Sequence, residues 1–163
     1  MIGNERILSM KRKILFVCTG NTCRSPMAEA LFKNLLEERD DLARKFVVSS
    51  AGVYAFEGDS ATHEAIAALR EDFNIDLTSH RARVLDGRDI REAWLILTMT
   101  AHHKEMILEL YPQAADKVYT LKDYAEAADG HDISDPYGRD LATYKKCAGE
   151  IESLLMDIAD KLE

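Results

Sequence analysis

The sequence contains few of the residues that build secreted or low-complexity proteins. Its 163 residues include three cysteines, three prolines and eight glycines. Three unevenly placed cysteines are too few for the disulfide framework of a small secreted protein. No Ser/Gly/Pro-rich stretch and no internal repeat suggests a linker or a repeat architecture. Because 47% of the residues are hydrophobic, the chain is predicted to bury the core of one domain.

Long apolar runs and excess positive charge are also missing. Residues 1–13 lack the apolar core of a signal peptide, and the run 14–17 is too short to span a bilayer. The net charge of −8 disfavours nucleic acid and anionic membranes as partners, and it suits basic protein substrates better than acidic ones. We therefore expect a cytoplasmic enzyme. Its domain spans 11–163. Either residues 1–10 are a poorly ordered extension, or Met10 is the true start.

Cofactor motifs are absent as well. The sequence has no Gly-rich nucleotide fingerprint and no Walker-type lysine. His63-Glu64 begins a zinc-protease pattern, but Ala67 stands where the second histidine is needed. His102 and His103 are adjacent, so they cannot share one face of a helix as ligands four residues apart would. We expect neither a metal nor an organic cofactor.

Strand and helix patterns alternate along the chain. Short apolar runs favour strands, and apolar residues at spacings of three or four favour helices. The alternation predicts a single-domain α/β fold: a doubly wound, four-stranded parallel sheet flanked by helices, which binds ligands at the carboxyl ends of its strands. The closing helix has the clearest stripe, and Cys147 on it is expected to pack in the core. The expected strands are 14–17, 46–52, 94–99 and 117–121; the expected helices are 26–38, 61–73, 102–111 and 141–162.

The first strand leads into a loop whose residues suit a phosphoryl group. Cys18 is followed, after five residues, by Arg24 and Ser25. Backbone N–H groups converging above a helix N-terminus form an anion-binding nest. The Arg24 fork matches two phosphoryl oxygens, and the positive surroundings favour the nucleophilic thiolate of Cys18. At Gly20, a Cβ is expected to clash within the turn or to block the approaching phosphate, so we expect glycine to be needed there. Ser25 is expected to cap a helix whose first residue is Pro26.

The octapeptide from Cys18 to Ser25 resembles the phosphate loop of the low-molecular-weight protein-tyrosine-phosphatase family. The resemblance implies the same fold and a loop that binds phosphate through seven residues. More narrowly, Thr22 stands where tyrosine-directed members usually carry isoleucine, and threonine there resembles the bacterial protein-arginine phosphatase branch. The implied phosphate-binding residues are Thr19, Gly20, Asn21, Thr22, Cys23, Arg24 and Ser25.

A second chemical stretch spans residues 131–138. A leaving group of high pKa needs a proton donor opposite the nucleophile, and Asp135 is held by the fixed φ of Pro136. Asp-Pro-x-Gly is also a common turn, and Asp132 is a competitor, although no proline follows it. The family resemblance implies that Asp135 is the general acid. It also implies that Tyr137 lines the substrate side chain; a surface turn tyrosine is the alternative.

Further roles are implied by the resemblance alone. In the family, an asparagine of the loop is held by a serine after the second strand and by a more distant histidine, here Asn21, Ser50 and His80. Such a network would keep Asn21 in an unfavourable backbone geometry and hold the nest open. Cys18 and Cys23 resemble a pair that forms a protective disulfide, although Cys23 also suits plain packing.

We expect a phosphatase that works through a phosphocysteine intermediate. Its substrates are phosphorylated proteins, with phosphoarginine favoured through Thr22 and phosphotyrosine as the alternative, and its product is inorganic phosphate. Catalysis is expected from Cys18, Arg24 and Asp135, and a Ser25 hydrogen bond would improve Cys18 as a leaving group. An arsenate reductase would need further cysteines, and only Cys147 remains. A non-catalytic phosphoprotein-binding module stays open, as do the cellular substrates, the kinase and the oligomeric state.

Overall fold

The computed structural model describes residues 11–163; the expected extension 1–10, with Met10, lies outside the described residues. Four parallel strands form one sheet in the order β2-β1-β3-β4. This order confirms the predicted doubly wound topology, because the chain moves outward from the central strand β1 in both directions. The strands are β1 (Arg12–Cys18), β2 (Phe46–Gly52), β3 (Ala93–Thr98) and β4 (Val118–Thr120).

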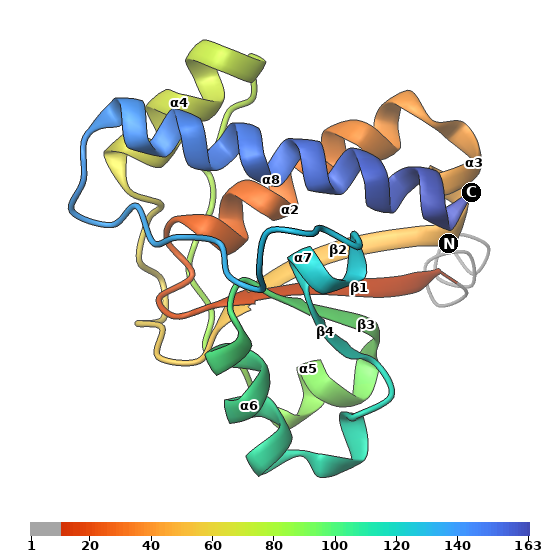
Figure 1. Ribbon diagram of the computed structural model, residues 1–163. Coiled ribbons are helices and arrows are strands. Elements are labelled where there is room, and N and C mark those ends of the chain that lie inside the picture. Colours follow the sequence, from red (N-terminus) through yellow and green to blue (C-terminus); the bar gives the residue numbers. More distant parts are fainter. Residues whose placement is uncertain (1–10) are drawn as a thin grey trace, which may run out of the picture.

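Helices cover both faces of the sheet (Figure 1). On one face, α8 packs across α2 and α4, and α3 follows α2. The opposite face carries α5 and α6, and α7 follows β4. Their bounds are α2 (Arg24–Glu38), α3 (Asp40–Lys45), α4 (His63–Phe73), α5 (Gly87–Glu92), α6 (Ala101–Leu110), α7 (Leu121–Tyr124) and α8 (Leu141–Leu162), with a 3₁₀ turn at Pro112–Ala114.

Strand β1 is buried on both faces, and its side chains alternate between two cores. Ile14 and Phe16 pack toward α2 and α8, whereas Leu15 and Val17 pack toward α5 and α6. A strand has a side-chain period of two, so Cys18 falls on the side of Ile14 and Phe16. The strand therefore delivers the cysteine to the helix that follows it, at the carboxyl end of the sheet.

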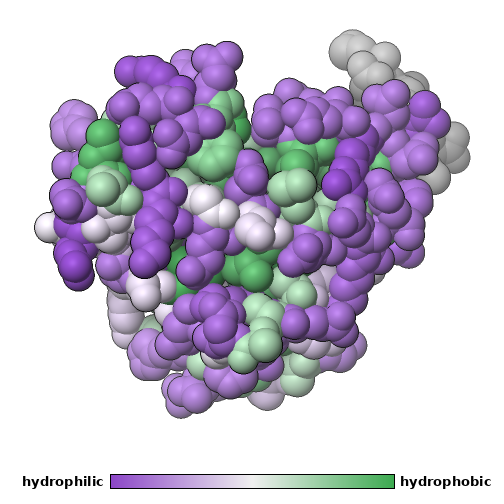
Figure 2. Space-filling model, turned by 45° about the horizontal axis from the view of Figure 1, so that its top comes forward, coloured by the Kyte–Doolittle hydropathy of each residue, from purple (hydrophilic) through white to green (hydrophobic). Residues whose placement is uncertain are grey.

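The closing helix α8 has the buried apolar face that its sequence pattern predicted. Asp140 caps α8 by accepting a hydrogen bond from the Thr143 N–H at 2.9 Å. Cys147 is buried on the apolar stripe that faces α2 and α4, which confirms its expected packing role. Within residues 11–163, no helix combines the length and the apolarity that a bilayer crossing requires. On the face that Figure 2 shows, hydrophilic residues cover most of the surface and hydrophobic ones appear in its hollows.

Candidate active site

The loop between β1 and α2 is held open from behind. Asn21 has a φ of 56°, in the left-handed region that side chains rarely occupy. Its Nδ2 donates to the hydroxyls of Ser25 at 2.8 Å and Ser50 at 2.9 Å, and its Oδ1 accepts from the Arg83 N–H at 3.0 Å. His80 Nε2 donates to the Asn21 carbonyl at 2.7 Å. The structure thus brings Asn21, Ser50 and His80 together as expected, and four hydrogen bonds offset the strain.

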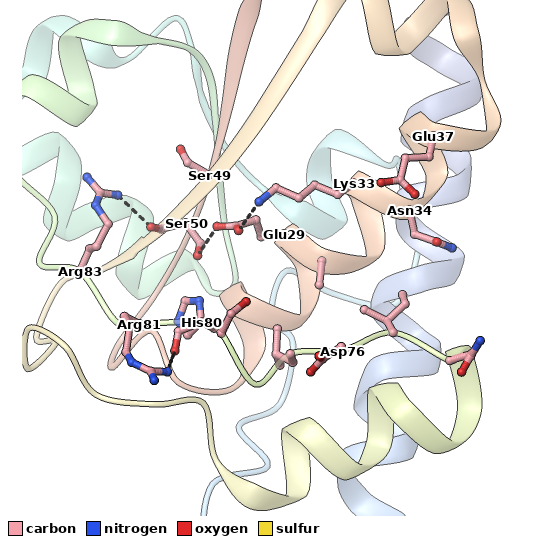
Figure 3. A pocket seen from close by; sticks show the side chains of 15 residues that line it. Glu29, Lys33, Asn34, Glu37, Ser49, Ser50, Asp76, His80, Arg81 and Arg83 are labelled. Atoms are coloured by element: carbon pink, nitrogen blue, oxygen red, sulfur yellow. Dashed lines mark hydrogen bonds and ion pairs between the residues drawn. The ribbon is translucent and has the colours of Figure 1, made fainter.

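The network continues behind the loop into residues that the sequence analysis missed. The Ser50 hydroxyl donates to Glu29 at 2.8 Å, and Lys33 pairs with Glu29 at 2.9 Å. Arg83 Nη1 donates to the Ser50 carbonyl at 3.0 Å, so Ser50 is fixed through two atoms (Figure 3). These side chains line a polar hollow of about 620 Å³, which contains neither Cys18 nor Arg24. The signal for Glu29 in the sequence was its spacing of four residues from Lys33.

The expectation that the turn itself requires Gly20 is wrong. A Cβ on Gly20 would meet only Thr22 Oγ1 at 3.6 Å, an ordinary contact, so no protein atom excludes a side chain there. The glycine that sterics require is Gly52, where a Cβ would lie 2.5 Å from the Thr19 carbonyl oxygen and 2.9 Å from the Asn21 nitrogen. The carboxyl end of β2 can therefore approach the loop closely only because residue 52 has no side chain.

Ser25 does not cap α2, contrary to expectation. The helix begins one residue earlier, at Arg24, and Cys23 at its N-cap makes no side-chain capping bond. The Ser25 hydroxyl instead lies 2.9 Å from Cys18 Sγ. Because that hydroxyl already accepts from Asn21, its own hydrogen is available to the sulfur. This arrangement fits the expected support of Cys18 by Ser25.

Arg24 and Asp135 meet across the cavity. Arg24 is only 5% exposed; its Nη1 donates to the Ile133 carbonyl at 2.9 Å, and its Nη2 lies 3.5 Å from Asp135 Oδ2. The other oxygen of Asp135 accepts from the Tyr137 N–H at 3.0 Å. The competitor Asp132 instead accepts from the Ala101 N–H at 2.8 Å, at the start of α6. Of these two aspartates, Asp135 is therefore the one that lies near the cysteine loop.

One cavity of about 250 Å³ unites the two predicted stretches. Asn21 and Ser25 are fully buried behind it and are not among its lining residues. The cavity is also lined by Tyr54, Phe56 and Asp59, which come from the segment after β2 and were not predicted from the sequence. Two aromatics just past a strand's carboxyl end were a signal for Tyr54 and Phe56. The lining residues are Cys18, Thr19, Gly20, Thr22, Cys23, Arg24, Tyr54, Phe56, Asp59, Asp135 and Tyr137.

His103 supports the loop from α6, a role that the sequence analysis also missed. Its Nε2 lies 2.8 Å from Thr19 Oγ1, and its Nδ1 has no hydrogen-bond partner within residues 11–163. Burial first, and then the positive charge of Arg24, lower the pKa of His103 from its ordinary value of 6.5 to about 4. The imidazole is therefore neutral at pH 7, and it adds no charge to the cavity.

The other two cysteines are protonated neighbours. Burial raises the pKa of Cys23, whose Sγ lies 3.3 Å from the Tyr144 hydroxyl. Burial likewise raises the pKa of Cys147 to about 12, and its Sγ donates to the Ser134 carbonyl at 3.9 Å. Although remote from Cys18 in sequence, Cys147 therefore lies behind the segment that carries Asp135. All three thiols are free, with Cys18 and Cys23 at the same cavity.

The cavity can support phosphoryl transfer. A thiol, a buried guanidinium and a half-exposed carboxylate converge on one space. A guanidinium and loop amides suit phosphoryl oxygens, and a carboxyl near the mouth suits a leaving group. No group of three metal-ligating side chains occurs within residues 11–163.

Comparisons with known proteins point in the same direction. A family model described as low molecular weight phosphotyrosine protein phosphatase matches residues 13–163. The Protein-arginine-phosphatase of Geobacillus stearothermophilus is 43% identical over 154 residues, which cover 94% of this chain and 98% of that relative. A solved low molecular weight protein tyrosine phosphatase from T. tengcongensis is 40% identical, with a TM-score of 0.85 over 93% of this chain and 99% of that chain.

A further similar structure is a mutant of the YwlE arginine phosphatase with a phosphorylated active-site serine. It is 43% identical to this chain, with a TM-score of 0.85, and the match covers 92% of this chain and 95% of that one.

Proposed function

The chain belongs to the low molecular weight phosphotyrosine protein phosphatase family, and we propose that it is the protein-arginine phosphatase kind of this cysteine-dependent enzyme. One observation carries the proposal: Cys18, Arg24 and Asp135 line a single cavity whose loop also presents Thr22. A relative 43% identical to this chain is named a protein-arginine-phosphatase, which supports the choice of substrate.

The first step transfers the phosphoryl group to the enzyme. The Cys18 thiolate attacks phosphorus while Arg24 and the loop amides hold the oxygens. The S–P bond forms and the P–N bond breaks, and Asp135 gives its proton to the departing nitrogen of the guanidine. Arg24 supports this geometry because the Ile133 carbonyl holds one of its nitrogens and the other faces Asp135 at 3.5 Å. The mutant relative with a phosphorylated active-site serine supports a covalent intermediate.

The second step releases phosphate. Asp135, now a carboxylate, takes a proton from a water molecule that attacks the phosphocysteine. The S–P bond breaks, inorganic phosphate leaves, and the Cys18 thiolate returns. A hydrogen bond from the Ser25 hydroxyl, 2.9 Å from Cys18 Sγ, stabilises the thiolate as a leaving group.

The choice between arginine and tyrosine depends on the cavity wall. Thr22 contributes a small polar side chain where a bulky apolar one would suit a phenol ring, and a carboxylate at the mouth can pair with a guanidinium. Phosphotyrosine remains the competing substrate, since a structural relative 40% identical to this chain is called a tyrosine phosphatase. An arsenate reductase is disfavoured because Cys147 is buried behind the Asp135 segment and protonated at neutral pH.

A side-by-side assay tests the function. Matched peptides carrying phosphoarginine or phosphotyrosine are incubated with the wild type and with Cys18→Ser. We expect a higher kcat/KM for phosphoarginine and, in the variant, loss of turnover by at least about 10³-fold with retained peptide binding. A preference for phosphotyrosine would contradict the substrate, and full hydrolysis by Cys18→Ser would contradict the covalent mechanism. A binding module would show affinity without turnover in the wild type.

We also propose that Cys23 protects Cys18. Peroxide would oxidise the Cys18 thiolate to a sulfenic acid with release of hydroxide, and the Cys23 thiol would displace water to form a disulfide. Cys18 and Cys23 line the same cavity, which supports this step. After mild peroxide treatment, a thiol reductant should restore the wild type more fully than Cys23→Ser; equal recovery would refute the switch. A thiolate enzyme of this kind needs a reducing compartment, which favours the cytoplasm.

A further inference from the structure

The segment after β2 is fixed against the phosphate loop. Val53 donates its N–H to the Cys18 carbonyl at 3.0 Å, and Tyr54 donates to the Thr19 carbonyl at 2.9 Å. Farther along, the Asp59 carbonyl accepts from the Ala82 N–H at 2.7 Å. The Thr62 N–H then donates to the Thr22 carbonyl at 3.0 Å. Backbone bonds before and after Asp59 therefore fix its distance from the loop.

Asp59 is the second carboxylate of the cavity, and its state differs from that of Asp135. Asp135 is already engaged: one oxygen accepts from the Tyr137 N–H and the other faces Arg24. The Asp59 carboxylate makes no hydrogen bond or ion pair with any other residue in the range 11–163, and it is solvent-exposed at the cavity. One acidic group is thus committed to the reacting end of the cavity, whereas the other is available to a ligand.

The aromatic side chains of the cavity are also unusually exposed. Tyr54 is 68%, Phe56 77% and Tyr137 69% exposed, although large apolar groups are normally covered. Exposed aromatics around a cavity suggest that a ligand covers them. A planar cation such as a guanidinium stacks well on aromatic faces.

Phosphoarginine has two ends that need different partners. Its phosphoryl group is anionic and matches Arg24 and the loop amides. Its guanidinium is cationic and presents N–H groups on the two nitrogens that do not carry phosphorus. Those N–H groups match a carboxylate in a two-bond arrangement, whereas phosphotyrosine presents an apolar ring in the same place. Since Asp135 must deliver a proton to the bridging nitrogen, a separate carboxylate is needed to hold the rest of the guanidinium.

We infer that Asp59 is the substrate-selecting carboxylate of this cavity: it binds the outer nitrogens of the guanidinium, inside a rim formed by Tyr54, Phe56 and Tyr137. This inference rests on the proposed phosphoarginine activity and names the group that recognises the leaving end. Asp59 touches the substrate but transfers no proton, so its loss weakens binding of one substrate class.

The test is Asp59→Asn, measured on matched phosphoarginine and phosphotyrosine peptides. The change keeps the shape of the side chain and removes its charge. We expect kcat/KM for phosphoarginine to fall by about tenfold or more, mostly through KM, because a charged hydrogen-bonding partner is lost. The value for phosphotyrosine should stay unchanged or rise. Asp59→Glu should recover part of the phosphoarginine activity.

Asp116→Asn is the matched control, since it removes the same charge from an exposed residue that does not line this cavity. Asp116→Asn should leave kcat/KM for both substrates unchanged. The inference is overturned if Asp59→Asn leaves kcat/KM for phosphoarginine unchanged or lowers kcat/KM for both substrates by the same factor. It is also overturned if Asp59→Asn has the same effect as Asp116→Asn. In those cases the proposed function survives, provided that the wild type prefers phosphoarginine. A wild type without phosphoarginine turnover overturns the proposed function and, with it, this inference.

Discussion

The two walls of the cavity are built in opposite ways. The phosphate wall, residues 18–25, is mostly buried: Arg24 is 5% exposed, and Asn21 and Ser25 are inaccessible. Thr19 is its one exposed residue, and Gly20 and Thr22 are half-buried. Four hydrogen bonds hold Asn21 from behind. The leaving-group wall consists of residues that reach into solvent, and its Asp135 side chain is 53% exposed. Its members are Tyr54, Phe56, Asp59, Asp135 and Tyr137.

This difference separates chemistry from selection. Transfer of a phosphoryl group needs donors that are fixed before the reaction, because reorganising them would cost free energy in the transition state. A buried wall with a complete hydrogen-bond network meets that need. The choice of leaving group needs side chains that a bulky protein substrate can reach. Changes in the buried residues of the phosphate wall should therefore affect every substrate alike. Changes in the leaving-group wall, and in Thr22, which is only partly buried and lines the cavity, should affect substrates differently.

Arg24→Lys should have the largest effect, because it removes the planar fork from the phosphate wall and keeps its charge. Arg24 contacts both the Ile133 carbonyl and Asp135, so an ammonium cannot replace its geometry. We expect kcat/KM to fall by about 10²- to 10³-fold for both substrates. Steady-state kinetics measure the change. A loss confined to phosphoarginine would break the proposed division between the walls.

His103→Asn should change how stability depends on pH. Because the pKa of His103 is about 4 in the folded protein against an ordinary 6.5, the unfolded chain binds the extra proton between these values. The free energy of unfolding should therefore fall as pH drops from about 6.5 to about 4, by roughly 2 to 3 kcal/mol from this group. Above pH 6.5 this contribution is fully present.

In His103→Asn that part of the pH dependence should disappear, because asparagine does not titrate in this range. Urea unfolding at several pH values measures the effect. An unchanged pH profile in the variant would mean that His103 is not held neutral beside the phosphate wall.

Ser50→Ala should have a smaller effect. It removes one acceptor of Asn21 and the donor to Glu29. We expect a loss of about 1 to 2 kcal/mol in the free energy of unfolding. The kcat for both peptides should fall by the same factor, because the loop loses support without losing a substrate contact. Ser49→Ala, on the neighbouring residue of β2, is the control. Unequal losses for the two peptides would place Ser50 in substrate selection.

Local patterns in the sequence were enough to predict the sheet, the closing helix and the loop. The apolar runs of β1 and β3 predicted a buried parallel sheet, and the stripe of α8 predicted its packing face. The loop from Cys18 to Ser25 was recognisable because strand, loop and helix lie consecutively. The short helices α3, α5 and α7 were missed, since six residues or fewer give too little periodicity to detect.

The parts of the site that were not predicted from the sequence depend on contacts between segments that are far apart in the chain. Thr19 and His103 are 84 residues apart, and Ser50 and Glu29 are 21 apart. Ser25 was wrongly predicted to cap a helix because serine is a common N-cap residue. In the structure its hydroxyl instead lies 2.9 Å from Cys18 Sγ. Asp59 gave no signal, because nothing in a lone exposed aspartate shows that backbone bonds to Ala82 place it at the cavity.

The most direct test of phosphoarginine as the substrate is the selectivity of Thr22→Ile. The measured quantity is the ratio of kcat/KM for phosphoarginine to kcat/KM for phosphotyrosine on matched peptides, in the wild type and in the variant. Thr22 lines the cavity beside Cys18, and a larger apolar side chain there should disfavour a guanidinium and favour a ring. We predict a ratio above one in the wild type and a clear fall in Thr22→Ile; the same ratio in both proteins would contradict the account.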